Sequence, residues 1–132
     1  MRDLRKLDVA VVARQLALAV YERTGRFPAH ERYALAAQMR RAGVSIESYI
    51  AEGTGRGSDR EFLRFLYIAL GSATELAVQL DLAITLGFID GGDGAILIDR
   101  TNHVLRMLNR LTASMRQKLG NARTGPAPSQ FA

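Results

Sequence analysis

The sequence contains no cysteine, no tryptophan and only three prolines in 132 residues. Without cysteine the chain can form neither a disulfide nor a thiolate zinc site, and it has no thiol nucleophile. No apolar run approaches the roughly 18–20 residues of a membrane-spanning helix, and the mean hydropathy is close to zero. The charged N-terminal segment lacks the apolar core and cleavage site of a signal peptide. We therefore expect a cytoplasmic protein with no membrane segment.

Lysine is nearly absent as well. Lys6 and Lys118 are the only two lysines among 18 basic residues, against 13 acidic residues, and the formal net charge is +5. The preference for arginine fits the codon bias of a GC-rich genome. The distribution of charge is more informative, because six basic residues and no acidic residue lie between positions 100 and 123. A local cationic field of this kind attracts polyanions.

Apolar periodicity and helix start and stop signals predict four helices, at residues 4–24, 29–54, 59–86 and 94–119. The breaks between them are short and rich in glycine, which favours antiparallel hairpins. The sequence therefore predicts an all-α protein, an antiparallel up-down-up-down four-helix bundle in residues 1–119. Residues 120–132 have no periodicity and are predicted to form a flexible tail.

Local signals mark several helix ends and contacts. Ser58 and Glu61 form an S-x-x-E capping box at the start of the third helix, and Asp93 is the expected N-cap of the fourth. Gly120 is expected to end that helix. Gly43 and the pair Gly71-Ser72 lie inside helices, where glycine costs about 1 kcal/mol relative to alanine. We expect close helix contacts at both places.

The first predicted helix is apolar over more than half of its circumference. A helix of this kind is buried on more than one side. In a small bundle, this pattern indicates an oligomer interface in addition to the core.

The centre of the chain resembles the 23S ribosomal RNA intervening-sequence protein family. A Ser-Ile, Ile-Ala-Glu-Gly element is followed by a short turn and then by Ala-x-Gly-Ser, and the resemblance runs from Leu7 to Ile89. The motif residues, to which we assign structural roles, are Ser45, Ile46, Ile50, Ala51, Glu52, Gly53, Arg56, Gly71, Ser72 and Glu75.

The resemblance implies a four-helix bundle that assembles into a homopentamer and has no enzymatic activity. It also implies a role like that of related proteins in diversity-generating retroelements. There, a basic pentamer serves as the accessory subunit of a reverse transcriptase and associates with nucleic acid.

The fourth predicted helix carries the candidate nucleic-acid-binding residues, which are Arg100, His103, Arg106, Arg110, Arg116 and Lys118. Cations on this face could contact phosphate groups and release counterions. The alternative is a solvated face whose cations are favoured near the C-terminal end of the helix dipole. No aromatic residue alternates with these charges, so base stacking is not indicated.

No arrangement of residues indicates catalysis, a metal site or a cofactor. Glu52 is the most plausible carboxylate, but Arg56 lies four residues later and is expected to pair with it. His30 and His103 share no helix face with a metal-binding carboxylate. The chain also lacks a phosphate-binding loop of the P-loop type. The central aromatic residues are expected in the core or in a subunit interface; they are Tyr33, Tyr49, Phe62, Phe65 and Tyr67.

Two hypotheses remain open from the sequence. In the first, the protein is an oligomeric basic scaffold that binds RNA or DNA, with a reverse transcriptase as its protein partner. In the second, it is an interaction module that binds only protein, and its charge serves solubility. The acid-free fourth helix supports the first hypothesis, and the absence of an aromatic platform beside those charges supports the second.

Overall fold

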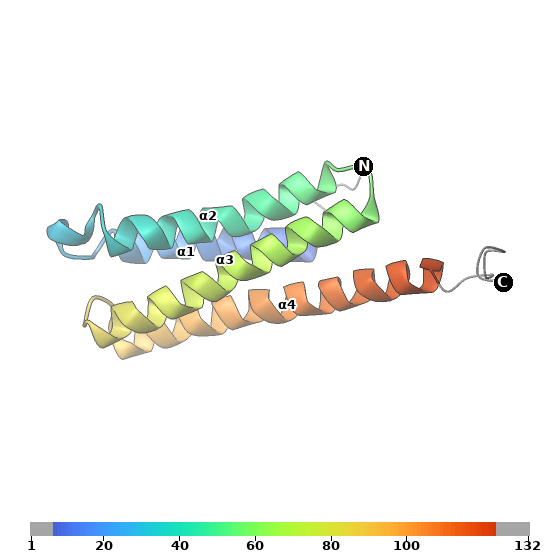
Figure 1. Ribbon diagram of the computed structural model, residues 1–132. Coiled ribbons are helices and arrows are strands. Elements are labelled where there is room, and N and C mark those ends of the chain that lie inside the picture. Colours follow the sequence, from blue (N-terminus) through green and yellow to red (C-terminus); the bar gives the residue numbers. More distant parts are fainter. Residues whose placement is uncertain (1–6, 124–132) are drawn as a thin grey trace, which may run out of the picture.

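The computed structural model describes residues 7–123, which form four long helices and one short 3-10 turn (Figure 1). The helices are α1 (Asp8–Thr24), α2 (Leu35–Thr54), α3 (Asp59–Thr85) and α4 (Gly91–Arg123), and the 3-10 turn is η2 (Ala29–Glu31). No strand occurs within residues 7–123. Successive helices run in opposite directions, and α4 lies beside both α3 and α1. The predicted all-α four-helix bundle is therefore confirmed.

The core forms along the predicted stripes of the helices. In α3, apolar residues at alternating spacings of four and three are at most 1% exposed: Phe62, Leu66, Ala69, Ala73, Leu76, Leu80 and Ala83. This spacing keeps one seam of the helix facing its neighbours. Thr101 of α4 is also fully buried, and its hydroxyl donates to the Leu97 carbonyl at 2.7 Å. The core thus contains a polar group without leaving its hydroxyl unpaired.

The second predicted helix is interrupted near its start. Residues 29–31 form η2, and α2 begins only at Leu35 because Ala34 has φ −114° and ψ −111°, outside the helical region. Phe27 packs against Phe88 with ring centroids 5.5 Å apart, and the His30 ring meets Phe88 edge-on at 6.4 Å. These contacts tie the connection to the α3–α4 turn, so it does not continue as a regular helix.

Both ends of α4 differ from the prediction. Asp90, not Asp93, caps the helix, because Asp90 Oδ1 accepts from the Asp93 backbone N–H at 2.9 Å. The Asp93 carboxylate instead pairs with Arg23 of α1 at 3.1 Å. At the other end the helix continues through Gly120 to Arg123. The rest of the predicted tail, residues 124–132, lies outside the described residues.

The end of α3 follows the sequence signal at Gly87. This glycine has φ +79°, a conformation that other residues rarely adopt. The Phe88 N–H donates to the Ala83 carbonyl at 2.9 Å, and the Gly87 N–H donates to the Ile84 carbonyl at 3.0 Å. This pair of bonds is a Schellman motif, which satisfies the last carbonyls of the helix.

α3 is long and apolar enough to cross a membrane by length and composition, although charged residues interrupt its apolar runs. Of its most apolar window, 33% is buried inside the bundle. Core helices of soluble proteins share this length and composition.

We expect the Asp90 cap to make stability depend on pH. The hydrogen bond from the Asp93 N–H lowers the pKa of the Asp90 carboxyl. Its stabilising effect is therefore present above the unfolded-state pKa, about 3.9, and is lost as the pH falls through the folded-state pKa. In urea unfolding, wild type should be more stable than Asp90→Asn at pH 7, and the difference should shrink near pH 3. Asp90→Ala should be the least stable at pH 7, since asparagine keeps a cap acceptor. An unchanged difference between the two pH values would contradict this role of the carboxylate.

Candidate nucleic-acid interface

The middle of α4 presents a cationic row to solvent. His103, Arg106 and Arg110 are exposed, and their spacing of three and four residues places them on one side of the helix. Within residues 7–123, Arg106 and Arg110 form no ion pair. Both side chains are therefore exposed without an ion-pair partner in the described part of the chain, although Arg110 borders a hollow together with Asp8 of α1.

Arg100 occupies a different environment. Together with Asp99 and His103 it borders a groove of about 740 Å³ between α1 and α4, and Glu22 of α1 lies on the opposite side. The groove exists because these two helices have the least extensive contact of the neighbouring pairs in the bundle. Two carboxylates therefore share the groove with Arg100, and its charge is partly balanced there.

The last two candidate residues also differ from the central row. Lys118 Nζ pairs with Asp59 Oδ2 of α3 at 2.9 Å, although the lysine side chain is 65% exposed. Arg116 is exposed, but it lies roughly 80° around the helix from Arg106 at 3.6 residues per turn. The predicted set is thus not one continuous face; its core is His103, Arg106 and Arg110.

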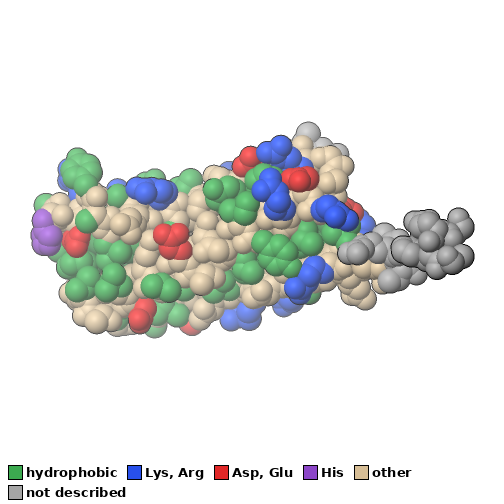
Figure 2. Space-filling view, viewed as in Figure 1, with side chains coloured by type: hydrophobic (Ala, Val, Ile, Leu, Met, Phe, Trp, Pro, Cys, Tyr) green, Lys and Arg blue, Asp and Glu red, His purple; other side chains and the backbone are tan. Residues whose placement is uncertain are grey.

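Basic residues are distributed unevenly over the surface. On the face shown in Figure 2, most Lys and Arg side chains lie toward the end where α2 joins α3 and where α4 finishes. On this face, the positive charge is therefore concentrated toward one end of the bundle.

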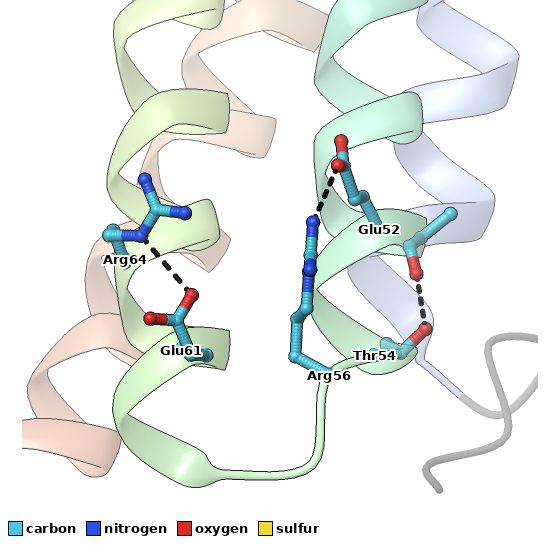
Figure 3. A network of polar contacts seen from close by, with 6 residues as sticks. Glu52, Thr54, Arg56, Glu61 and Arg64 are labelled. Carbon is cyan, nitrogen blue, oxygen red and sulfur yellow. Dashed lines mark hydrogen bonds and ion pairs between the residues drawn. The ribbon is translucent and has the colours of Figure 1, made fainter.

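The α2–α3 turn contains a compact polar network (Figure 3). The predicted pair of Glu52 and Arg56 is present at 3.0 Å, and Arg64 pairs with Glu61 at 3.2 Å. Both guanidinium groups lie over the ring of Phe65, with distances of 5.0 and 4.7 Å to its centroid. Each arginine is thus held between a carboxylate and an aromatic ring. Glu52 stabilises the turn and is engaged in this role.

A capping box has two reciprocal hydrogen bonds, and at the start of α3 the one accepted by the serine is present. The Ser58 hydroxyl accepts from the Glu61 N–H at 3.1 Å, as the sequence predicts. The Glu61 carboxylate instead accepts a hydrogen bond from Arg64, with which it forms an ion pair.

Most of the remaining motif residues have a role inside the bundle. Ile46 and Ile50 are fully buried, and Gly53 lies so close to α3 that a methyl group there would be 2.9 Å from the Phe65 Cβ. The Ser45 hydroxyl donates to the Ala42 carbonyl at 2.8 Å. Gly71 is the exception, because none of residues 7–123 approaches within 4 Å of the position where its Cβ would be. The described residues therefore do not make the close helix contact predicted at Gly71.

Three further motif residues, Ala51, Ser72 and Glu75, lie on α2 and α3. The Ala51 carbonyl accepts from the Thr54 hydroxyl at 2.7 Å, and Glu75 accepts from the Gln79 amide at 3.2 Å. Ser72 is half-buried on α3. Gly43 also approaches α1, since an added Cβ would lie 3.5 Å from the Ala17 Cα. A methyl group fits there at ordinary van der Waals distance.

The aromatic residues do not behave as a single group. Phe62 and Phe65 are buried, at 1% and 4% exposed, as expected for core residues. Tyr49 stacks on Phe65 with ring centroids 6.4 Å apart. Tyr33, however, is 88% exposed and Tyr67 is 41% exposed. These two tyrosines therefore lie outside the core, and the alternative of a subunit interface stays a prediction for them.

A second cationic surface, which the charge pattern of the fourth helix does not reveal, lies on α1, α2 and the connection between them. We call it the α1–α2 basic face, and it consists of Tyr21 of α1, Arg40 and Arg41 of α2, and Arg32 of the connection, which the exposed Tyr33 follows in the chain. A sequence signal for it exists, because neither Arg40 nor Arg41 has an acidic residue three or four positions away. The nearness of Tyr21 to Arg40 becomes apparent only once α1 packs on α2.

Within residues 7–123, no group of three or more His, Asp or Glu side chains is placed to hold a metal ion. His30 lies against Phe88, and His103 borders the α1–α4 groove. The two histidines therefore belong to different environments.

Comparison with known proteins identifies a family. Residues 5–110 match the family described as 23S rRNA-intervening sequence protein. A crystal structure of a protein of unknown function from the S23 ribosomal protein family of Bacteroides thetaiotaomicron is similar in fold, with a TM-score of 0.75. The two chains are 21% identical, and the similarity covers 80% of this chain and 95% of the other. No curated protein matches significantly.

Proposed function

The chain belongs to the 23S rRNA-intervening sequence protein family, and we propose that it is a non-catalytic, homo-oligomeric basic scaffold that binds nucleic acid through arginine-rich helix faces. The observation that carries this proposal is the row of Arg106 and Arg110. Both are exposed and unpaired within the described residues, on a helix without acidic residues from position 100 to position 123.

The chemistry of the row suits the phosphate backbone. Each arginine offers a planar guanidinium that can donate two parallel hydrogen bonds to a phosphate group. Binding would release counterions from the nucleic acid, so affinity would depend strongly on salt and weakly on sequence. We propose contacts to RNA or DNA, centred on Arg106 and Arg110 and extended by Arg100, His103, Arg116 and Lys118.

Exposed apolar residues support the homo-oligomer. Val11 and Leu18 of α1 are 47% and 65% exposed, and Val78 of α3 is 66% exposed. Large side chains of this kind, when they recur along one helix, are typical of protein interfaces. The resemblance to the family supports a pentamer. Five copies would bring five equivalent α4 rows into one assembly and strengthen its attraction for polyanions.

The proposed protein partner is a reverse transcriptase of a retroelement, and the proposed location is the cytoplasm. The partner rests on the family resemblance, and the location is in keeping with a chain that contains no cysteine. A scaffold with a cationic surface could hold a template close to such a polymerase without taking part in its chemistry.

A titration of the purified protein with short RNA and DNA duplexes, followed by fluorescence anisotropy, tests the proposal. If six or more phosphates are neutralised in the assembly, affinity should fall by about 10³-fold between 50 and 200 mM salt. Sedimentation velocity on the same sample gives the number of subunits. Absence of binding at 50 mM salt would overturn the nucleic-acid role and favour the protein-interaction module. A monomer at micromolar concentration would overturn the oligomer.

A further inference from the structure

The α1–α2 basic face surrounds two adjoining hollows that both include Arg40. One, of about 460 Å³, is lined in part by Tyr21, Arg40, Arg41, Ser48 and Tyr49. The other, of about 370 Å³, is lined in part by Thr24, Arg32 and Arg40. No acidic side chain lines either hollow. The surface therefore offers several hydrogen-bond donors to an anion and no carboxylate to repel it.

Arg40 is fixed at the centre of this face. Its Nε donates to the Thr24 hydroxyl at 2.8 Å, and its Nη2 donates to the Tyr21 carbonyl at 3.3 Å. Its guanidinium also lies over the Tyr21 ring, 4.8 Å from the centroid. An arginine has five N–H donors, so three remain for an external group. A fixed guanidinium loses less conformational entropy when it binds a phosphate.

Two carboxylates of α1 and α2 near this face are already engaged, since Glu22 pairs with Arg26 at 3.2 Å and Glu47 pairs with Arg14 at 2.8 Å. Glu31 precedes Arg32 in the chain, but it lines neither hollow and forms no ion pair with Arg32 within the described residues. Within residues 7–123, Arg32 and Arg41 form no ion pair. The positive charge of the face is therefore not neutralised within the described part of the chain.

Aromatic rings distinguish this face from the α4 row. Tyr21 is 47% exposed and Tyr33, which follows Arg32 in the chain, is 88% exposed. A tyrosine exposed to that degree contributes little to the core. Flat rings beside arginines are the elements that bind single-stranded nucleic acid, because an unpaired base can stack on the ring while its phosphate contacts the cation.

We propose that the α1–α2 basic face binds a single-stranded segment of nucleic acid, with phosphates at Arg32, Arg40 and Arg41 and bases stacked on Tyr21 and Tyr33. This inference rests on the proposed nucleic-acid function and gives it a second contact with a different selectivity. A duplex keeps its bases stacked inside and cannot use the rings. The α4 row, which has only cations, accepts single and double strands alike.

A double substitution of the rings tests this inference. In Tyr21→Leu/Tyr33→Leu, affinity for a single strand of about 16 nucleotides should fall about 10-fold or more, since stacking on each ring contributes about 1–3 kcal/mol per base. Affinity for the duplex of the same sequence should change less than about 2-fold, because the phosphate contacts remain. Tyr21→Phe/Tyr33→Phe keeps the rings and should retain single-strand binding. Tyr67→Leu removes an exposed tyrosine of α3 and should have no effect.

The possible results separate this inference from the function on which it rests. If wild type binds neither probe, both proposals fail. If wild type binds both probes but the leucine variant keeps its preference for the single strand, this inference fails and the α4 proposal stands. An equal loss for both probes would also overturn it, since stacking cannot act on a duplex. A changed subunit number in sedimentation would show that the face joins copies of the chain, and would likewise overturn the inference.

Discussion

Replacing Arg106 and Arg110 by glutamate is expected to weaken nucleic-acid binding by about 100-fold or more at low salt. Each substitution removes a cation that can neutralise a phosphate and introduces a charge that repels one. Both side chains are exposed, so the fold should not change. In an assembly, the substitution acts once in every subunit that contacts the same strand, which multiplies the effect. The measurement is the dissociation constant by anisotropy at about 50 mM salt, with the slope of log K against log salt as a second readout.

A variant with the same change in net charge on another surface provides the control. Arg14 of α1 has a side chain that is 68% exposed and that already pairs with Glu47 of α2. Arg14→Glu should weaken binding much less than Arg106→Glu alone, which changes the net charge equally, because distant charges are screened over about 10 Å at 0.1 M salt. An equal loss in both variants would mean that only net charge matters. It would contradict a localised α4 contact.

The fold could be predicted because the relevant signals are local. The alternating spacing of four and three in α3 requires only the helical period, and the glycine at position 87 marks the end of that helix by its own conformational freedom. The ends of α4 were harder to predict from the sequence. The sequence predicts Asp93 as the cap, but that carboxylate pairs with Arg23 of another helix, and Asp90 caps α4 instead. Gly120 carries only a small helix penalty, which the remainder of α4 can offset.

The candidate site was predictable only in part, for a similar reason. The outward row of Arg106 and Arg110 follows from 3.6 residues per turn within a single helix. Lys118 pairs with Asp59, which lies far away in sequence on another helix. The periodicity of a single helix cannot predict such a pair. The α1–α2 basic face also depends on two helices, since Arg40 reaches Tyr21 across their contact. Charge patterns within one helix therefore locate isolated rows of cations but not composite surfaces.

Gly53 is expected to be the glycine least tolerant of substitution in the motif. In Gly53→Ala the new Cβ would lie 2.9 Å from the Phe65 Cβ and 3.0 Å from the Phe62 Cδ1. The Phe65 Cβ is fixed to the backbone of α3, so α2 and α3 must separate to make room. Overpacking of this kind costs about 1–3 kcal/mol, and the better helix propensity of alanine offsets about 1 kcal/mol of it. We expect a net loss of up to about 2 kcal/mol in the free energy of unfolding, measured in urea.

The same substitution at Gly71 is the matched control. No described residue lies within 4 Å of its Cβ position, so Gly71→Ala should stabilise the chain by about 1 kcal/mol through helix propensity alone. The two variants add the same methyl group to the same type of element, and they should differ by the overpacking cost, about 1–3 kcal/mol. Equal stabilities would contradict the close α2–α3 contact at Gly53. A destabilised Gly71→Ala that also dissociates in sedimentation would instead place a neighbouring subunit against Gly71, because no residue described in this chain approaches it. The motif would then specify the bundle through Gly53 and the assembly through Gly71.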